Sequence, residues 1–162
     1  MRKLLPLLIL LFAFEAHSNE IIVMENVEWL YLNKERSLSA VRDRNDPNSL
    51  MVTNLVFSTW AMADASINAE VAPFMAELWI SRLKDVLLWF QNNHNSSFER
   101  WLRIQEHMLF QAESENDVEE LKQLQKRLIN HLQKYESKSG IYWKPVGRYL
   151  EVLRKIQIKS FR

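Results

Sequence analysis

The scarcity of glycine constrains the fold of this chain more than any other feature. Only Gly140 and Gly147 occur among the 162 residues, together with four prolines. Tight β-hairpins need glycine or asparagine at positive φ, and no segment alternates apolar and polar residues with the period of two that a half-buried strand has. Helices joined by polar segments are what remain. The sequence therefore predicts an all-α fold.

The first 18 residues have the order of a cleaved secretory signal peptide. Arg2 and Lys3 give a positive start, residues 4–14 form an apolar run, and Ala16 and Ser18 place small residues at the −3 and −1 positions. The run is shorter than the roughly 17 to 25 apolar residues of a membrane-spanning helix. We expect cleavage after Ser18 and a periplasmic or secreted product. The alternative interpretation is a buried N-terminal helix of the core.

The composition of the mature chain limits its class. Removing 18 residues from 162 leaves residues 19–162, enough for a single domain with a core. There is no cysteine, so apolar burial alone must stabilise it. The leader holds two of the 21 basic and one of the 20 acidic residues, so 19 of each sign remain and no nucleic-acid partner is indicated. The apolar stretch 71–90 contains four charged residues, so we expect no transmembrane segment in the mature chain.

Hydrophobic periodicity predicts a bundle of five or six helices. The expected helices cover residues 21–36, 50–67, 74–90, 98–111, 117–138 and 146–156. Pro73 is expected to end or kink the chain between the second and third of these. The third helix is apolar nearly all round, which is typical of a helix at the centre of a bundle.

Charge is distributed unevenly along the chain. Residues 113–120 contain five acidic residues and no basic one, whereas the last 25 residues contain seven basic residues and only one acidic residue. The acidic cluster is explained by the preference of carboxylates for a first helical turn. The basic segment is either a solvated face near that acidic turn or a docking surface for an acidic partner or an anionic membrane.

An aromatic joint precedes the last helix. Tyr142 and Trp143 lie there, next to Lys144 and Arg148. Exposed aromatic and cationic side chains together are enriched at the energetically dominant positions of protein interfaces. These four residues are therefore a candidate partner-binding face. In the other interpretation, the two aromatic rings simply cover the end of the bundle.

The sequence predicts no metal, no cofactor and no catalytic residue. His94, His107 and His131 belong to three different elements, and the Glu-x-x-His pairs of di-iron bundles are absent. Attachment of a c-type haem needs cysteines, and a phosphate-binding loop needs clustered glycines. A catalytic triad assembles in space rather than in sequence, so that possibility stays open.

Polar residues in apolar surroundings suggest one ligand site. Trp60, Asp64 and Asn68 share one face of the second expected helix, and Arg82 falls within the apolar stripe of the third. If these helices are antiparallel across the proline, Asp64 and Arg82 can meet as a partly buried pair. That pair is either structural or lines a pocket for a ligand with one polar end. The walls of such a pocket would be Trp60, Trp79 and Met62.

Three functions from different classes are compatible with these observations. The first is a non-enzymatic protein-interaction module of the bacterial cell envelope, of the inhibitor or immunity type or an accessory factor of a secretion or surface assembly. Its partner would be another envelope or secreted protein, and an acidic protein is one of the candidates. The second is a periplasmic carrier of a small hydrophobic or amphipathic ligand. The third is a helical enzyme that uses Asp64 or Glu77 as acid or base.

Overall fold

The fold is all-helical, as the sequence predicts. The computed structural model describes residues 21–63, 65–92, 97–105, 109–112, 114–140 and 143–158. Residues 21–32 are helical and are followed by α2 (Lys34–Arg42), α3 (Ser49–Met62), α4 (Ala65–Ser81), α5 (Leu83–Asn92), α6 (Ser97–Ile104), α7 (Glu115–Gln133) and α8 (Lys144–Lys155). None of the described residues forms an extended strand. The predicted signal peptide lies outside them.

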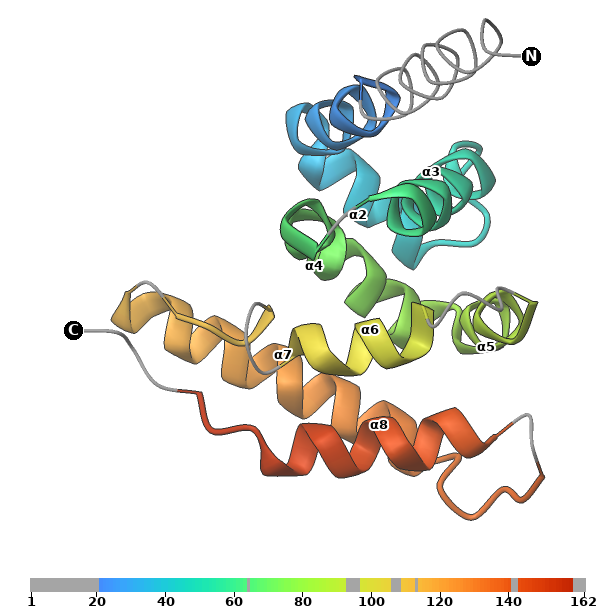
Figure 1. Cartoon of the computed structure of the whole chain (residues 1–162), viewed down its shortest axis with the longest axis vertical. Helices are drawn as coiled ribbons and strands as arrows, with labels where there is room; N and C mark the ends of the chain where they lie inside the picture. The colour runs from blue at the N-terminus through green and yellow to red at the C-terminus, as the bar shows by residue number, and fades with distance from the viewer. Residues whose placement is uncertain are drawn as a thin grey trace, which may run out of the picture.

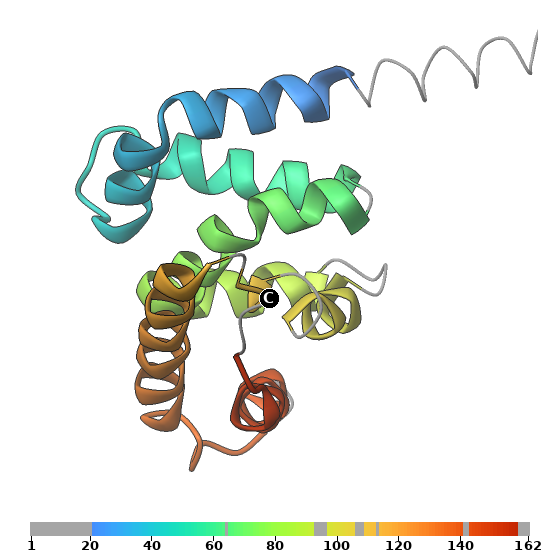
Figure 2. The same ribbon diagram turned by 90° about the vertical axis from the view of Figure 1, so that its left-hand side faces the viewer.

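Helix α4 is the centre of the molecule, because it contacts α2, α3, α5, α6 and α7. Residues 21–32, α2 and α3 lie at one end, whereas α7 and α8 lie side by side at the other (Figures 1 and 2). We call residues 21–92 the N-terminal half and residues 97–158 the C-terminal half. Within the described ranges, no helix combines the length and apolarity needed to cross a bilayer.

The first expected helix is divided. A turn at Asn33 separates residues 21–32 from α2, and the Asn33 side-chain amide donates a hydrogen bond to the carbonyl of Trp29 over 2.9 Å. Helix α2 then continues to Arg42, through a segment in which we expected a polar connection. The buried face of α2 is short, comprising Ser37, Ala40 and Val41, and so small a face gives little periodic signal.

The predicted break at Pro73 is wrong. Helix α3 ends at Met62 and α4 begins at Ala65, so Pro73 lies inside α4. A proline within a helix removes a backbone donor and costs about 3 kcal/mol. Complete or nearly complete burial of Phe74, Met75 and Leu78 offsets that cost here. The expected helix 74–90 is instead divided at Arg82, between α4 and α5.

Aromatic rings form the middle of the core. Trp79 of α4 is fully buried, and its ring centroid lies 4.8 Å from that of Tyr149 in α8 and 6.4 Å from that of Trp101 in α6. Trp60 of α3 lies 5.3 Å from Trp101 in an edge-to-face arrangement. Offset and edge-to-face ring pairs add stability beyond the burial of their surface. These tryptophans therefore join four helices into one core.

Candidate functional site

The structure does not assemble the pocket that the sequence suggests. Asn68 lies in the first turn of α4, and Arg82 follows its last residue. Because α4 is one continuous helix that rises 1.5 Å per residue, these two residues are about 20 Å apart along its axis. Asp64 lies outside the described residues. The expected walls Trp60 and Trp79 are fully buried against other rings and belong to the core.

Arg82 has a structural role at the other end of α4. Its side chain is nearly buried, its Nε donates to the carbonyl of Val41 over 3.4 Å, and its guanidinium also hydrogen-bonds the Ser49 hydroxyl. Asp85 lies 3.6 Å from the guanidinium and balances its charge. A buried cation needs partners of this kind. Arg82 therefore joins the ends of α2 and α3 to α4.

Arg100 of α6 is the cation that contacts Trp60. Its guanidinium lies 5.6 Å from the Trp60 ring centroid and donates to the carbonyls of Trp60 over 2.6 Å and of Ala63 over 3.2 Å. The Asn68 amide donates to the same Ala63 carbonyl over 3.1 Å. The last carbonyls of a helix lack partners within it and carry partial negative charge. Arg100 thus caps α3, which has no basic residue in its own last turn.

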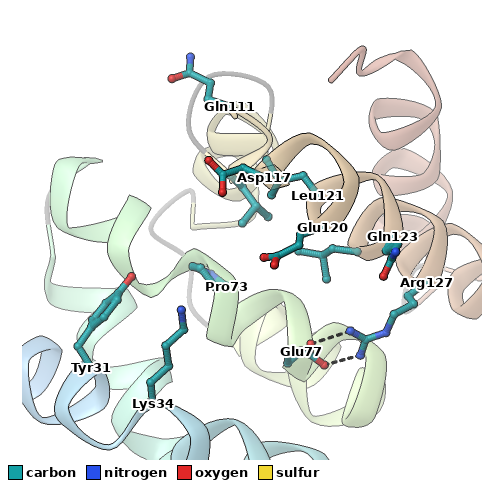
Figure 3. Close-up of a pocket in the computed structure, with 12 residues that line it drawn as sticks. Tyr31, Lys34, Pro73, Glu77, Gln111, Asp117, Glu120, Leu121, Gln123 and Arg127 are labelled. Carbon is teal, nitrogen blue, oxygen red and sulfur yellow. Dashed lines mark hydrogen bonds and ion pairs between the residues drawn. The ribbon is translucent and has the colours of Figure 1, made fainter. Parts of the chain in front are cut away.

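An open cleft of about 600 Å³ lies between the N-terminal helices, α4 and α7 (Figure 3). Residues of five segments line it: Tyr31, Lys34, Pro73, Glu77, Leu109, Gln111, Asp117, Glu120, Leu121, Gln123, Leu124 and Arg127. Its lining mixes leucines with charged and amide groups. Ligand pockets of comparable volume are usually more apolar and more enclosed.

Glu77 connects the two halves of the protein beneath this cleft. Arg127 of α7 donates two hydrogen bonds to the Glu77 carboxylate over 2.9 and 2.7 Å, as Figure 3 shows, and Arg42 of α2 donates a third over 2.8 Å. Burial raises the pKa of Glu77, but the hydrogen bonds and charges of the two arginines outweigh that effect and lower it. Glu77 is therefore an ionised structural anchor, and both of its oxygens are occupied.

The other polar groups of the cleft suit recognition better than catalysis. The Tyr31 hydroxyl donates to the carbonyl of Glu70 over 3.0 Å, and burial together with the Glu70 charge raises the pKa of Tyr31 to about 12. Lys34 and Glu120 both point into the space between the helices (Figure 3). Among the described lining residues we find no nucleophile held by a base. The cleft offers hydrogen-bond donors, acceptors and apolar contacts.

The candidate face at the aromatic joint is occupied by contacts within the chain. Trp143 stacks on Tyr135, in the turn that follows α7, with ring centroids 5.4 Å apart, and the Lys138 amino group lies 4.6 Å from the Trp143 ring. Arg148 donates two hydrogen bonds to the Glu99 carboxylate of α6. Lys144 is exposed, and Tyr142 lies outside the described residues. The geometry favours a cover over the end of α7 and α8.

Several charged residues of the C-terminal half are likewise paired within the chain. Ser114 and Asp117 form a reciprocal capping box, so the acidic cluster begins α7 as expected. In the basic segment, Arg154 makes a two-pronged pair with Glu136, and Lys155 pairs with Glu151. In one interpretation of the sequence, the basic segment lies near the acidic cluster of residues 113–120. The carboxylates that pair with it here, Glu136 and Glu151, lie outside that cluster.

Sequence reasoning missed the exposed apolar surface of residues 21–32. Six of the ten large apolar side chains that are exposed in the described part of the chain belong to this segment: Ile21, Ile22, Met24, Trp29, Tyr31 and Leu32. Leu32 is 78% exposed, whereas Val23 and Leu30 on the opposite side of the helix are buried. The available signal was an apolar segment with too few polar positions for a surface helix. Tyr31 belongs both to this surface and to the cleft.

Neither a cluster of metal ligands nor a similar protein points to another site in the described part of the chain. No group of three or more metal-ligating side chains converges in the part of the chain that the structure describes. Burial lowers the pKa of His131, whose ring contacts Tyr135, while His94 and His107 lie outside the described residues.

The chain matches no protein-family model, and no curated protein or solved structure is detectably similar to it.

Proposed function

We propose that the protein is an exported, single-domain, non-enzymatic interaction module of the bacterial cell envelope. We assign its partner-binding surface to residues 21–32, continuing at Tyr31 into the adjoining cleft. The observation that carries this proposal is the gathering of six exposed large apolar side chains on one short helix. Large exposed apolar patches on folded proteins are typical of surfaces that bind other proteins.

The chemistry of the surface limits the kind of partner. Glu25 and Glu28 are exposed between the apolar residues, and Lys34 and Glu120 border the cleft. An apolar centre with a polar rim is the usual composition of a protein interface. The partner is therefore a protein that offers an apolar patch flanked by basic or hydrogen-bonding groups. It need not be acidic, because the basic residues Arg148, Arg154 and Lys155 already have partners within the chain.

Site-specific photo-crosslinking in cells that produce the protein tests this proposal. A photoreactive amino acid at Met24 should give a discrete adduct of higher mass, and the same group at the exposed position Lys126 in α7 should give none. Replacing Leu32 by Gln in the Met24 variant should reduce the yield of the adduct. The recovered chain should begin at Asn19, as expected after cleavage behind Ser18. Equal labelling from both positions, or none from Met24, would contradict the assignment of the surface.

A further inference from the structure

The outward face of α3 is a second exposed surface, formed by other residues than the surface described above. Its exposed residues are Leu50, Met51, Asn54, Ser58, Ala61 and Met62. The 14 residues of α3 include no Asp, Glu, Lys, Arg or His. A helix on a protein surface normally carries charged or polar residues on its solvent side. An uncharged outward face with Leu50 at 69% exposure is instead typical of a helix that packs against something.

The spacing on this face is that of a helix-packing seam. Met51 and Ser58 are seven residues apart, as are Asn54 and Ala61, which is the repeat by which two helices align their contact residues. The large side chains lie at the two ends of α3, and smaller ones lie between them. The helix is about 21 Å long at 1.5 Å per residue. A second helix of the same length could therefore lie along it.

We propose that α3 pairs with α3 of a second copy of the protein, antiparallel about a two-fold axis near the middle of the helix. In this arrangement Met51 meets Ala61 and Asn54 meets Ser58 of the other copy, while Leu50 and Met62 flank the seam on its two edges. Apolar side chains then face each other at the ends of the seam, and an amide faces a hydroxyl at its centre. A two-fold interface requires this self-complementarity, in which residue i contacts j and j contacts i. Antiparallel pairing also brings opposite ends of the helix dipoles together.

Other occupants fit the face less well. Helices that lie on membranes generally carry Lys or Arg on their polar side, and α3 has neither. A charged partner would find no complementary charge on it.

The expected dimer is weak. One helix pair of this length buries less than the roughly 800 Å² per partner of a standard interface. The monomer and dimer should consequently exchange with protein concentration, and sedimentation velocity over a concentration series measures that equilibrium. The pairing uses none of residues 21–32, so it is independent of the function proposed above.

Charge variants test the pairing directly. Asn54→Glu with Ser58→Glu places like charges opposite each other across the two-fold axis and should raise the dimer Kd by at least about tenfold. Both side chains are exposed, so the fold should be retained, as checked by circular dichroism and urea unfolding. Asn130→Glu with Gln133→Glu is the matched control, because both residues are exposed and lie about one helical turn apart in α7. Should the acidic variant fail to fold, Met51→Gln serves as the second test of dissociation.

Mixing opposite variants distinguishes pairing with a second copy from any other occupant. Asn54→Lys with Ser58→Lys should also dissociate, and a 1:1 mixture with the acidic variant should restore a dimer that contains one chain of each. The proposal is overturned if the protein stays monomeric up to about 1 mM, where an association of millimolar Kd is still visible. It is equally overturned if the dimer is insensitive to the acidic variant, or if the face binds lipid vesicles instead. In each of these cases crosslinking through Met24 can still succeed, so the two proposals can fail separately.

Discussion

The two halves of the protein use their surfaces in opposite ways. All ten large apolar side chains that are exposed in the described part of the chain lie in the N-terminal half, on residues 21–32, α3 and α5. In the C-terminal half, several exposed charged side chains form ion pairs within the chain, as in Arg148–Glu99 and Arg154–Glu136. A patch of one charge in the sequence is therefore a poor guide to docking when its partners lie elsewhere in the same chain. In the described part of the chain, the surface that lacks contacts of this kind is the exposed apolar surface of the N-terminal half.

The largest expected effect comes from the contact that joins the halves. Arg127→Ala should lower the free energy of unfolding at pH 7 by about 2 to 3 kcal/mol, because it leaves the buried Glu77 carboxylate with Arg42 alone. Breaking a buried pair costs about 3 to 5 kcal/mol, and the effect is smaller here because Arg127 is half exposed. Urea unfolding measures the difference. Arg42→Ala is the control and should cost less, since Arg42 donates one hydrogen bond where Arg127 donates two.

The same contact should respond to pH with a defined sign. The pKa of Glu77 is lowered in the folded protein, so its stabilising contribution is fully present above the unfolded value of about 4.3. That contribution is lost as the pH falls through the lower, folded value. The stabilities of wild type and Arg127→Ala should therefore converge at strongly acidic pH. A constant difference down to acid would show that Arg127 acts by packing and not by pairing with Glu77.

Trp143→Ala should have an intermediate effect and decides the role of the aromatic joint. Loss of the stack on Tyr135 and of the contact with Lys138 should cost about 1 to 2 kcal/mol in urea unfolding. Trp143→Phe keeps a ring and should recover part of that loss. Unchanged stability in Trp143→Ala would instead support the original interpretation of a free binding face and would weaken the contrast between the halves.

Composition and short sequence patterns predicted the helical class of the fold and the start of one helix. Few glycines predicted an all-helical chain, and the acidic cluster of residues 113–120 predicted the start of α7. The expected continuity of the first helix through Asn33 and the expected helix end at Pro73 were both wrong, because tertiary packing decides whether a helix continues through such residues. Burial around Pro73 stabilises a helix that propensity alone would end.

The candidate site was less predictable, since it depends on which helices become neighbours. Trp60 and Asn68 were expected on one face of one helix, but they belong to α3 and α4, and the cation beside Trp60 is Arg100 from α6 and not Arg82. No spacing in the sequence links Arg100 to the end of α3. The exposure of residues 21–32 was also missed, because periodicity identifies an apolar face without showing how much of it neighbouring helices cover.

The smallest expected effect tests whether that exposed surface is free for binding. Leu32→Gln should change the free energy of unfolding by no more than about 0.5 kcal/mol, because the side chain is 78% exposed and both residues favour helices. Leu30→Gln is the matched control two residues away. Leu30 is fully buried, so its replacement should cost more than about 2 kcal/mol. If Leu32→Gln is as destabilising as Leu30→Gln, residues 21–32 are part of the core, and the contrast between the apolar N-terminal and charged C-terminal surfaces fails. If stability is unchanged while crosslinking through Met24 is reduced, Leu32 contributes to partner binding and not to folding.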